Sequence, residues 1–349
     1  MLIWSCLFAV ATYAIWRAGA VLVDATDIID EKLNLGSAFG GVILLAIATN
    51  LPEIAIMVSA AVKGNTGIIV GNLLGGVAIQ TVLLVLFDAR LKGGDPLTRR
   101  AANLVLVLEG LLVIAVLNIC VMGTQMPASF IFERATPGPL LITAIWLFGL
   151  WLIHWASCHP LGADGESKDG AVPSAAALES SHVTSATAQA DHLLSTAYRK
   201  FFLAALVTLM AGVALEWAGE AIAAQLHMDG VLFGATFLAA ATSLPEVATG
   251  LRAVKKGDYQ LAVSDIFGGN AFLPVLLLPA TLIAGQAVLP LAQKTDIYLT
   301  ALASLLTCIY LVGLIVRLPR KFLGLGFDSV AVLLFYLIGM VGLFAISGF

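Results

Sequence analysis

The chain has 349 residues, of which 60% are hydrophobic and only 11% are charged, and its mean hydropathy is +0.99. Soluble domains carry about 25% charged residues, so this composition excludes an ordinary soluble protein. The formal net charge of -4 is small, and the positions of the charges along the chain are more informative than their sum. The composition indicates a protein embedded in a membrane.

Apolar segments of membrane-spanning length recur along the whole chain. About 20 apolar residues in a helix cross the hydrocarbon core of a bilayer, and ten segments of the sequence have that character. We therefore predict an all-α polytopic membrane protein with ten transmembrane helices. The predicted spans are residues 2–23, 37–62, 67–87, 101–122, 139–157, 199–222, 230–253, 260–284, 295–316 and 325–347.

One stretch between the fifth and sixth spans, residues 158–197, lacks membrane character. It is rich in Ala, Ser, Gly and Thr, a composition typical of a flexible linker. It divides the chain into a first unit, residues 1–157 with spans 1–5, and a second unit, residues 198–349 with spans 6–10.

The two units repeat each other in sequence. Residues 41–53 read GVILLAIATNLPE, and residues 234–246 read GATFLAAATSLPE. Matching residues of the two segments lie 193 positions apart in the chain. This offset holds without a gap from Gly19, which matches Gly212, to Leu84, which matches Leu277. Each repeat holds five predicted spans, an odd number, so the second copy must enter the membrane inverted. Inverted repeats place a substrate site near the bilayer midplane, where the two copies meet.

Basic residues are divided unevenly between the two predicted sides of the membrane. Loops after the odd-numbered spans hold 14 of the 18 lysines and arginines, the other loops hold three, and one lies within the first span. Loops rich in positive charge remain in the cytoplasm. We therefore predict a multi-pass protein of the inner (plasma) membrane, with both termini outside, in the periplasm, and with the 158–197 linker in the cytoplasm.

Glu53 and Glu246 lie near the middle of otherwise apolar spans, at the same position of the two repeats. A bare carboxylate at bilayer depth costs several kcal/mol, so it normally faces a cavity, a partner or an ion. The alternative is a structural carboxyl group that is protonated or paired. The recurrence of the same costly residue favours ion binding.

Each of these glutamates directly follows a proline, Pro52 or Pro245. A proline inside a helix has no N–H, so the carbonyl group four residues earlier loses its helical partner. Freed carbonyl groups beside a carboxylate offer oxygen ligands to a hard cation. A proline kink needed only for packing explains the bend but not the neighbouring side-chain oxygens. Those predicted ion ligands are Thr49 and Asn50 in the first repeat, and Thr242 and Ser243 in the second.

A second pair of polar segments lies near the start of spans 3 and 8, with the sequences GNLLGGVAIQT and SDIFGGNAFLP. Helical residues four or eight apart share a face, which brings together the predicted oxygen donors Asn72 and Gln80. Asp265 is a third costly carboxylate, which we predict to be a ligand or a proton site. Asn270 is a further candidate oxygen donor. The paired glycines permit close helix approach, and packing alone explains them as well as a direct ion role does.

At these motifs the sequence resembles the calcium/cation antiporter superfamily, most closely its sodium/calcium exchanger branch. The residues that carry the resemblance are GVILLAIATNLPE with GNLLGGVAIQT, and GATFLAAATSLPE with SDIFGGNAFLP. The resemblance covers both repeats and implies ten spans, of which the first and sixth would slide as a gate across the others. The positions that match the family's calcium ligands are Glu53, Glu246, Thr49, Thr242 and Ser243, with Asn50 where serine is usual.

Several positions depart from the family pattern. The family usually has Gly-Ser in spans 3 and 8, and Gly76 and Gly269 replace both serines. Its later Asn or Asp positions correspond to Gln80 and Leu273, of which Leu273 cannot bind an ion. Asp265 stands where asparagine is usual. The oxygens that resemble sodium ligands are therefore depleted, whereas the calcium-type site is intact.

These features predict a secondary antiporter that exchanges Ca²⁺, or a related divalent cation, for Na⁺ or H⁺ by alternating access. The missing sodium ligands favour H⁺. The alternatives are a monovalent cation/proton antiporter and a non-transporting scaffold or sensor derived from an exchanger. The chain has no H-E-x-x-H, G-x-G-D or G-x-S-x-G motif, so we expect no enzyme. We expect inorganic cations and membrane lipid as partners, no nucleic acid, and no cofactor besides the transported ions.

Overall fold

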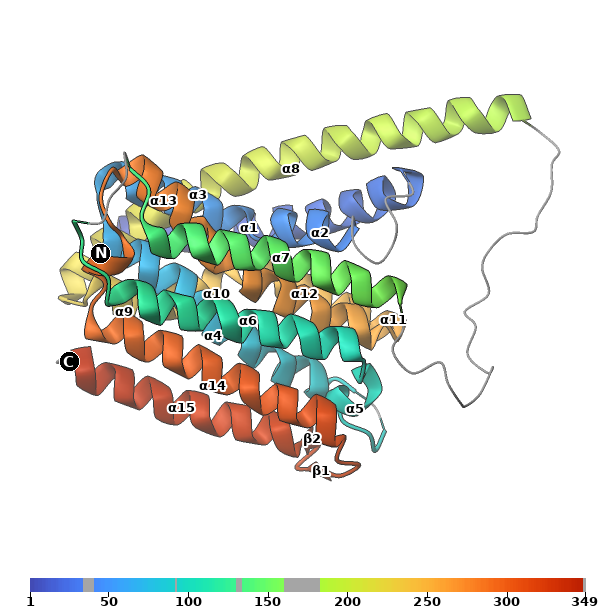
Figure 1. The fold of residues 1–349 in the computed structure, drawn as a ribbon. Helices are drawn as coiled ribbons and strands as arrows, with labels where there is room; N and C mark the ends of the chain where they lie inside the picture. Colours follow the sequence, from blue (N-terminus) through green and yellow to red (C-terminus); the bar gives the residue numbers. More distant parts are fainter. Residues whose placement is uncertain (34–40, 92, 130–133, 160–182, 348–349) are drawn as a thin grey trace.

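The computed structural model of the protein describes residues 1–33, 41–91, 93–129, 134–159 and 183–347, and it is almost entirely helical. Long helices lie side by side along a common direction (Figure 1). Within the described ranges, the strands are limited to two residues each, in β1 (Lys321–Phe322) and β2 (Leu325–Gly326), which pair antiparallel. The predicted all-α class is therefore confirmed.

The helices follow one another with short connections. In the first half of the chain they are α1 (Leu2–Leu33), α2 (Gly41–Thr49), α3 (Leu51–Lys63), α4 (Thr66–Ala89), α5 (Leu97–Ala101), α6 (Leu104–Thr124) and α7 (Pro137–Cys158). In the second half they are α8 (Val183–Leu226), α9 (Gly230–Phe233), α10 (Ala239–Thr242), α11 (Leu244–Lys256), α12 (Tyr259–Phe272), α13 (Leu277–Ala284), α14 (Lys294–Val316) and α15 (Phe327–Ser347). A π-helical turn, Gly234–Leu238, joins α9 to α10, and 3-10 turns occupy Leu273–Leu276 and Leu289–Leu291.

Eight of the described helical segments are long and apolar enough to cross a membrane. The bent pair Gly230–Thr242 and Leu244–Lys256, with 44° between its two parts, adds a ninth. Each of these nine coincides with a predicted span. The predicted second span, residues 37–62, corresponds to α2 and α3, and its first residues lie outside the described part of the chain.

The predicted linker differs from the structure in its extent. Helix α8 begins at Val183, so residues 183–197 are helical. This stretch contains no Gly or Pro and several strong helix formers, including alanine and leucine, and helix propensity therefore extends the sixth span backwards. Residues 160–182 of the predicted linker lie outside the described residues.

The surface of the bundle is apolar, and α4 lies in its interior. Phe202 on α8 is 69% exposed and Val341 on α15 is 71% exposed. In contrast, 83% of the most apolar stretch of α4 is buried, compared with 22% for α7 and α15. Large apolar side chains on the outside of a helix bundle are matched to lipid and not to water. The polar segment in α4 is therefore held at the centre of the molecule.

Helices α1 and α8 lie alongside each other (Figure 1), and each also contacts the Leu-Pro-Glu helix of the opposite repeat. A Cβ atom at Gly19 in α1 would lie 2.8 Å from the ring of Pro245. A Cβ atom at Gly212 in α8 would lie 2.9 Å from the carbonyl oxygen of Pro52. Both glycines and both prolines are repeat-related pairs. Any side chain at either glycine would push these helices apart, which explains why glycine occupies both positions.

Candidate functional site

Two matched helix breaks position the two glutamates. Helix α3 begins directly after Asn50, and α11 begins directly after Ser243. The backbone angles at these residues are nearly equal, with φ −87° and ψ 11° at Asn50, and φ −77° and ψ 6° at Ser243. Pro52 and Pro245 follow in the first turn of the new helices, where the N–H groups need no helical partner. The carbonyl groups four residues earlier lie in the last turn of the preceding helix, so the helix break itself, and not a kink within one helix, leaves them without a helical partner. Each glutamate also lies in the first turn of its helix, where the helix dipole favours a negative charge.

Glu53 and Glu246 are sealed inside the bundle. Both side chains are 0% exposed, and none of their carboxyl oxygens has a hydrogen-bond partner within the described residues. Buried charged groups in proteins are otherwise paired, hydrogen-bonded or bound to metal. The unmet bonding capacity of these oxygens is what a cation-binding site requires.

Each repeat contributes to the surroundings of the other repeat's glutamate. The Thr242 side chain lies next to the carboxyl group of Glu53, and the Thr49 side chain lies next to that of Glu246. Glu246 is also within electrostatic range of Glu53 and Asp265. The predicted acidic pair therefore lies together in the structure, at the contact between the two halves of the chain.

The small polar residues at both breaks donate their hydrogens to the preceding helical turn. Asn50 Oδ1 has no hydrogen-bond partner among the described residues, and hydroxyl oxygens that donate a hydrogen keep their lone pairs for a cation. The two breaks therefore hold oxygen atoms with free lone pairs beside the buried carboxylates, where a cation could bind them. The bonds are Thr49 Oγ1 to the Ala46 carbonyl at 3.3 Å, Asn50 Nδ2 to the same carbonyl at 2.6 Å, Thr242 Oγ1 to the Ala239 carbonyl at 3.2 Å, and Ser243 Oγ to that carbonyl at 2.7 Å.

Gly269 marks the point where the first break meets α4 and α12. A Cβ atom on Gly269 would lie 3.2 Å from Asn50 Nδ2 and 3.4 Å from Gln80 Oε1. Gln80 is 0% exposed, and neither polar atom of its side chain has a hydrogen-bond partner in the described part of the chain. The structure therefore brings together Asn50 and Gln80, two of the predicted oxygen donors.

The other predicted donors have different surroundings. Asn72 and Asp265 are buried, and their side-chain polar atoms have no partner within the described ranges. Asn270 donates to Thr81 Oγ1 at 3.0 Å, and its own oxygen is left without a partner there. The backbone of Asn72 lies against the π-helical turn, because a Cβ atom at Gly234 would lie 2.9 Å from its nitrogen.

A divalent cation at this site would need more than carboxylate ligands. Across the described residues, no group of three or more His, Cys, Asp or Glu side chains could hold a metal ion together. Hydroxyl, amide and carbonyl oxygens would complete the coordination of a hard cation between Glu53 and Glu246. One turn before Gln80 on α4, a Cβ atom at Gly76 would lie 3.1 Å from Leu273 Cδ1, so that position is apolar as its sequence indicates.

Two polar contacts near the site were not predicted from the sequence. Thr81 accepts the hydrogen bond from Asn270 described above, although its sequence context distinguishes it from no other threonine in a span. Ser264 Oγ donates to Glu109 Oε1 at 2.8 Å, and both residues are buried. Glu109 has no acidic counterpart in the second repeat, and no sequence pattern identifies Ser264 as its partner.

Both halves of the chain match a known protein family. The family model described as sodium/calcium exchanger protein matches residues 3–156 and 198–345. The chain belongs to this family. The resemblance found at the Leu-Pro-Glu motifs is thereby confirmed, and this exchanger is a membrane cation antiporter and not an enzyme.

Relatives of this exchanger match over most of its length. A putative antiporter, CaxA of Alkalimonas amylolytica, is 27% identical over 83% of this chain and 84% of its own. The inner membrane protein YrbG of Escherichia coli (strain K12) is 25% identical over 88% of each chain. Two solved structures share the fold. The H⁺/Ca²⁺ exchanger CAX has a TM-score of 0.65 and 11% identity, and the match covers 99% of this chain and 88% of the other. The sodium-calcium exchanger NCX_Mj has a TM-score of 0.62 and 15% identity, and the match covers 98% of this chain and 99% of the other.

Proposed function

We propose that this exchanger moves Ca²⁺, or a related divalent cation, across the inner membrane in exchange for H⁺ or Na⁺ by alternating access. The observation that carries the proposal is the pair of fully buried glutamates at matched helix breaks, whose carboxyl oxygens lack partners in the described structure. Glu53 and Glu246 would bind the cation directly. Thr49, Asn50, Thr242 and Ser243 would supply further oxygens.

Charge balance explains why such a site would exchange ions. Two carboxylates neutralise one divalent cation, so the occupied site is close to neutral and can reorient within the membrane at low cost. An empty site would hold two uncompensated charges at bilayer depth, close to a third carboxylate, Asp265. Protons or sodium ions must therefore replace the divalent cation before the site can reorient.

The membrane topology that we propose has ten spans in two inverted repeats. The second span would consist of α2 and α3, with its break at Asn50 matching the break at Ser243. The termini would lie outside and the connection between α7 and α8 in the cytoplasm, as the distribution of basic residues indicates.

Cysteine accessibility tests this topology at two described loops. Gly94 lies between α4 and α5, and a Cβ atom there would have no neighbour within 4 Å, so Gly94→Cys leaves the packing unchanged. In a background without the native cysteines, we expect an impermeant maleimide to label it in inverted vesicles and not in intact cells. Lys294→Cys, at the exposed start of α14, is the matched control and should show the reverse. Labelling of Gly94→Cys from outside would reverse the proposed orientation.

Repeat-related ion pairs join α1 and α8 to the ends of the Leu-Pro-Glu helices. Lys63 Nζ at the end of α3 lies 2.8 Å from Glu216 Oε2 and 2.8 Å from Glu220 Oε2 on α8. Lys256, its counterpart in α11, lies 3.6 Å from Asp27 on α1. The Lys63 pair includes the fully buried Glu216 side chain, whereas Lys256 and Asp27 are both exposed. Removal of Lys63 would leave the buried Glu216 carboxylate without its counter-charge, whereas loss of the exposed Lys256 pair leaves α11 joined to α1 by Arg252 and Asp24.

Removing each lysine should therefore have unequal effects. We expect Lys63→Gln to favour conformations in which α8 and α3 separate on the outer side, and to change the apparent affinity for external Ca²⁺ about tenfold, which corresponds to about 1.4 kcal/mol. Lys256→Gln is the matched control, and its effect should stay below about twofold because exposed pairs contribute about 0–1 kcal/mol. Exchange kinetics in right-side-out vesicles measure both. Equal effects of the two variants would contradict a special role for the α3–α8 contact.

A further inference from the structure

A β-hairpin with an exposed apolar tip joins the last two long helices. Its strands β1 and β2 lie at the end of the bundle where α14 meets α15 (Figure 1). Leu323 and Gly324 form the turn of this hairpin, with φ angles of 53° and 83°. Such turns favour Asn, Asp or Gly, because other side chains are strained at positive φ. Among the large hydrophobic side chains that the structure describes, Leu323 has the largest exposed fraction, 86%.

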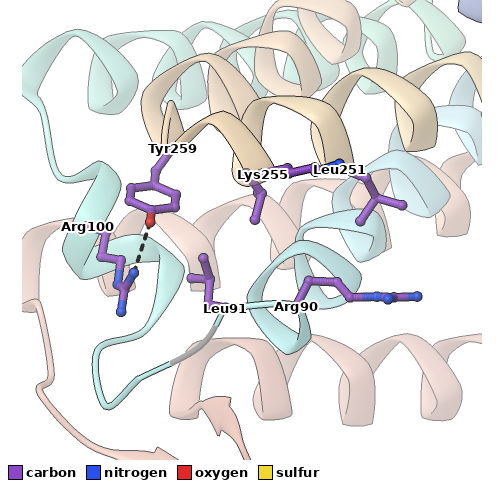
Figure 2. Close-up of a pocket in the computed structure, with 7 residues that line it drawn as sticks. Arg90, Leu91, Arg100, Leu251, Lys255 and Tyr259 are labelled. Carbon is purple, nitrogen blue, oxygen red and sulfur yellow. Dashed lines mark hydrogen bonds between the residues drawn. The ribbon is translucent and has the colours of Figure 1, made fainter.

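The hairpin is held against the bundle by Asp88, in the last turn of α4. The Asp88 carboxylate is buried and accepts hydrogen bonds from the backbone N–H groups of Gly326 at 2.6 Å and Leu97 at 2.8 Å. Lys321 Nζ lies 3.8 Å from the same carboxylate and donates to the Leu91 carbonyl oxygen at 3.4 Å. Leu91 lies just beyond this end of α4 (Figure 2). Strained residues persist only where the surrounding structure fixes them, and they cluster at functional positions.

The other side of the hairpin is apolar. Neighbouring residues of a strand point to opposite faces, so Phe322 points away from the carboxylate that Lys321 faces. Phe322 is exposed, and its ring stacks on that of Phe327, the first residue of α15, with 6.4 Å between the ring centroids. Leu318 and Val316, at the end of α14, are exposed as well. Exposed apolar residues therefore run along the chain from the end of α14, through the hairpin, to the start of α15.

Two arginines flank this apolar stretch. Arg317 and Arg320 are exposed, and neither forms an ion pair with a carboxylate of the described residues. Residues 317–326 contain no acidic side chain, and they connect two predicted spans, so they stay near the bilayer surface. Apolar and aromatic groups beside basic ones are typical of segments at the boundary between water and lipid. There the apolar groups enter the bilayer, and the cations contact anionic head groups.

We propose that this hairpin inserts its apolar tip, Phe322 and Leu323, into the phospholipid surface, with Arg317 and Arg320 at the phosphate groups of anionic lipids. Through Asp88, the inserted hairpin would fix the end of α4 relative to the bilayer. The candidate oxygen donors of α4 lie earlier on the same helix, so lipid contact at the hairpin would restrain the helix at the centre of the bundle. The proposal rests on α14 and α15 being spans, and not on which ions are exchanged.

Quenching of a fluorophore at the tip tests insertion in the purified full-length chain without any transport measurement. Leu323→Cys, in a background without the native cysteines, is labelled with bimane and placed in nanodiscs of phosphatidylcholine and phosphatidylglycerol. Gly94→Cys, in the exposed loop between α4 and α5, is the matched control at the same end of the bundle. We expect brominated lipids to quench the label at position 323 about threefold more than the label at position 94, because the inserted tip would lie at the boundary of the acyl chains. Aqueous iodide should show the reverse order.

Equal quenching by iodide at both positions, without an effect of brominated lipid, would place the tip in water and overturn the proposal. Protection of the tip from both quenchers would also overturn it, because a protein, such as a second copy of the chain, would then cover the tip.

The role of the arginines is tested by leaving phosphatidylglycerol out of the nanodiscs. We expect this omission to lower lipid quenching at position 323 about twofold, because the attraction of the basic residues to anionic head groups is lost. In the variant Arg317→Gln/Arg320→Gln the omission should have no effect. An equal decrease in that variant would overturn the role assigned to the two arginines.

Discussion

Replacement of either Glu53 or Glu246 by glutamine is expected to abolish divalent exchange while the chain still folds. Glutamine keeps the shape of the side chain but removes its charge, so a bound divalent cation would retain one uncompensated positive charge inside the membrane. Charges at that depth cost on the order of 3 kcal/mol, which corresponds to about a hundredfold loss of exchange. Uptake of radioactive Ca²⁺ into proteoliposomes measures the effect, with Mn²⁺ and Mg²⁺ as alternative substrates.

The control for this prediction is Glu109→Gln, which alters another buried carboxyl group. Its partner Ser264 donates the hydrogen bond, and a glutamine oxygen can still accept it, so exchange should remain close to that of the original chain. Thermal unfolding of the purified variants checks that all three fold. Full exchange in both single variants of the glutamate pair would refute the proposed site. A lack of any ion flux in the original chain would favour the scaffold or sensor alternative.

The second large effect concerns the counter-ion. We expect a pH gradient, acidic inside the vesicles, to drive Ca²⁺ uptake more strongly than a sodium gradient of equal size. Gly76 and Gly269 lack the hydroxyl groups of the family pattern, and Leu273 is buried and apolar. A sodium ion without these oxygens would remain partly desolvated, whereas protons need only carboxylates, which Glu53 and Glu246 provide. Initial rates of uptake under each gradient, at matched membrane potential, measure the preference.

Asp265 provides a separate test of the same idea. Its oxygens have no partner in the described structure, and it lies within electrostatic range of Glu246. Asp265→Asn restores the residue usual in the family and removes one of the three neighbouring carboxyl groups. We therefore expect this variant to shift the pH dependence of Ca²⁺ uptake, while Asp95→Asn, which alters an exposed residue paired with Arg99, should leave it unchanged. Strict dependence on sodium, without any response to pH gradients, would contradict proton exchange.

The Leu-Pro-Glu repeats predict much of the candidate site from the sequence alone. A buried carboxylate is conspicuous in an apolar span, and a proline acts on its own helix, so both signals are local to the sequence. The helix breaks at Asn50 and Ser243 follow directly from them. The two glutamates also lie close to each other in the structure, as expected for equivalent positions of two sequence repeats that pack together.

The partners of other polar residues could not be predicted in this way. Ser264 and Glu109 are 155 residues apart in the chain, and Asn270 and Thr81 are 189 apart. Such pairs depend on how helices rotate and slide against each other, and no periodic pattern specifies that rotation. The backward extension of α8 to Val183 was also missed, because a polar, Ala- and Ser-rich composition is compatible with both a helix and a linker.

The sequence by itself therefore determined that this chain is a helical membrane protein with two related halves, and where the carboxylates of its candidate cation site lie. Hydropathy and proline geometry are properties of single residues and their immediate neighbours, so both can be derived from the sequence without a structure. Only the tertiary structure decided that Thr242 lies beside Glu53 and Thr49 beside Glu246, and that the buried Asp88 carboxylate holds the hairpin between α14 and α15. Those arrangements arise from side-chain packing between distant helices, which the chain specifies only once it is folded.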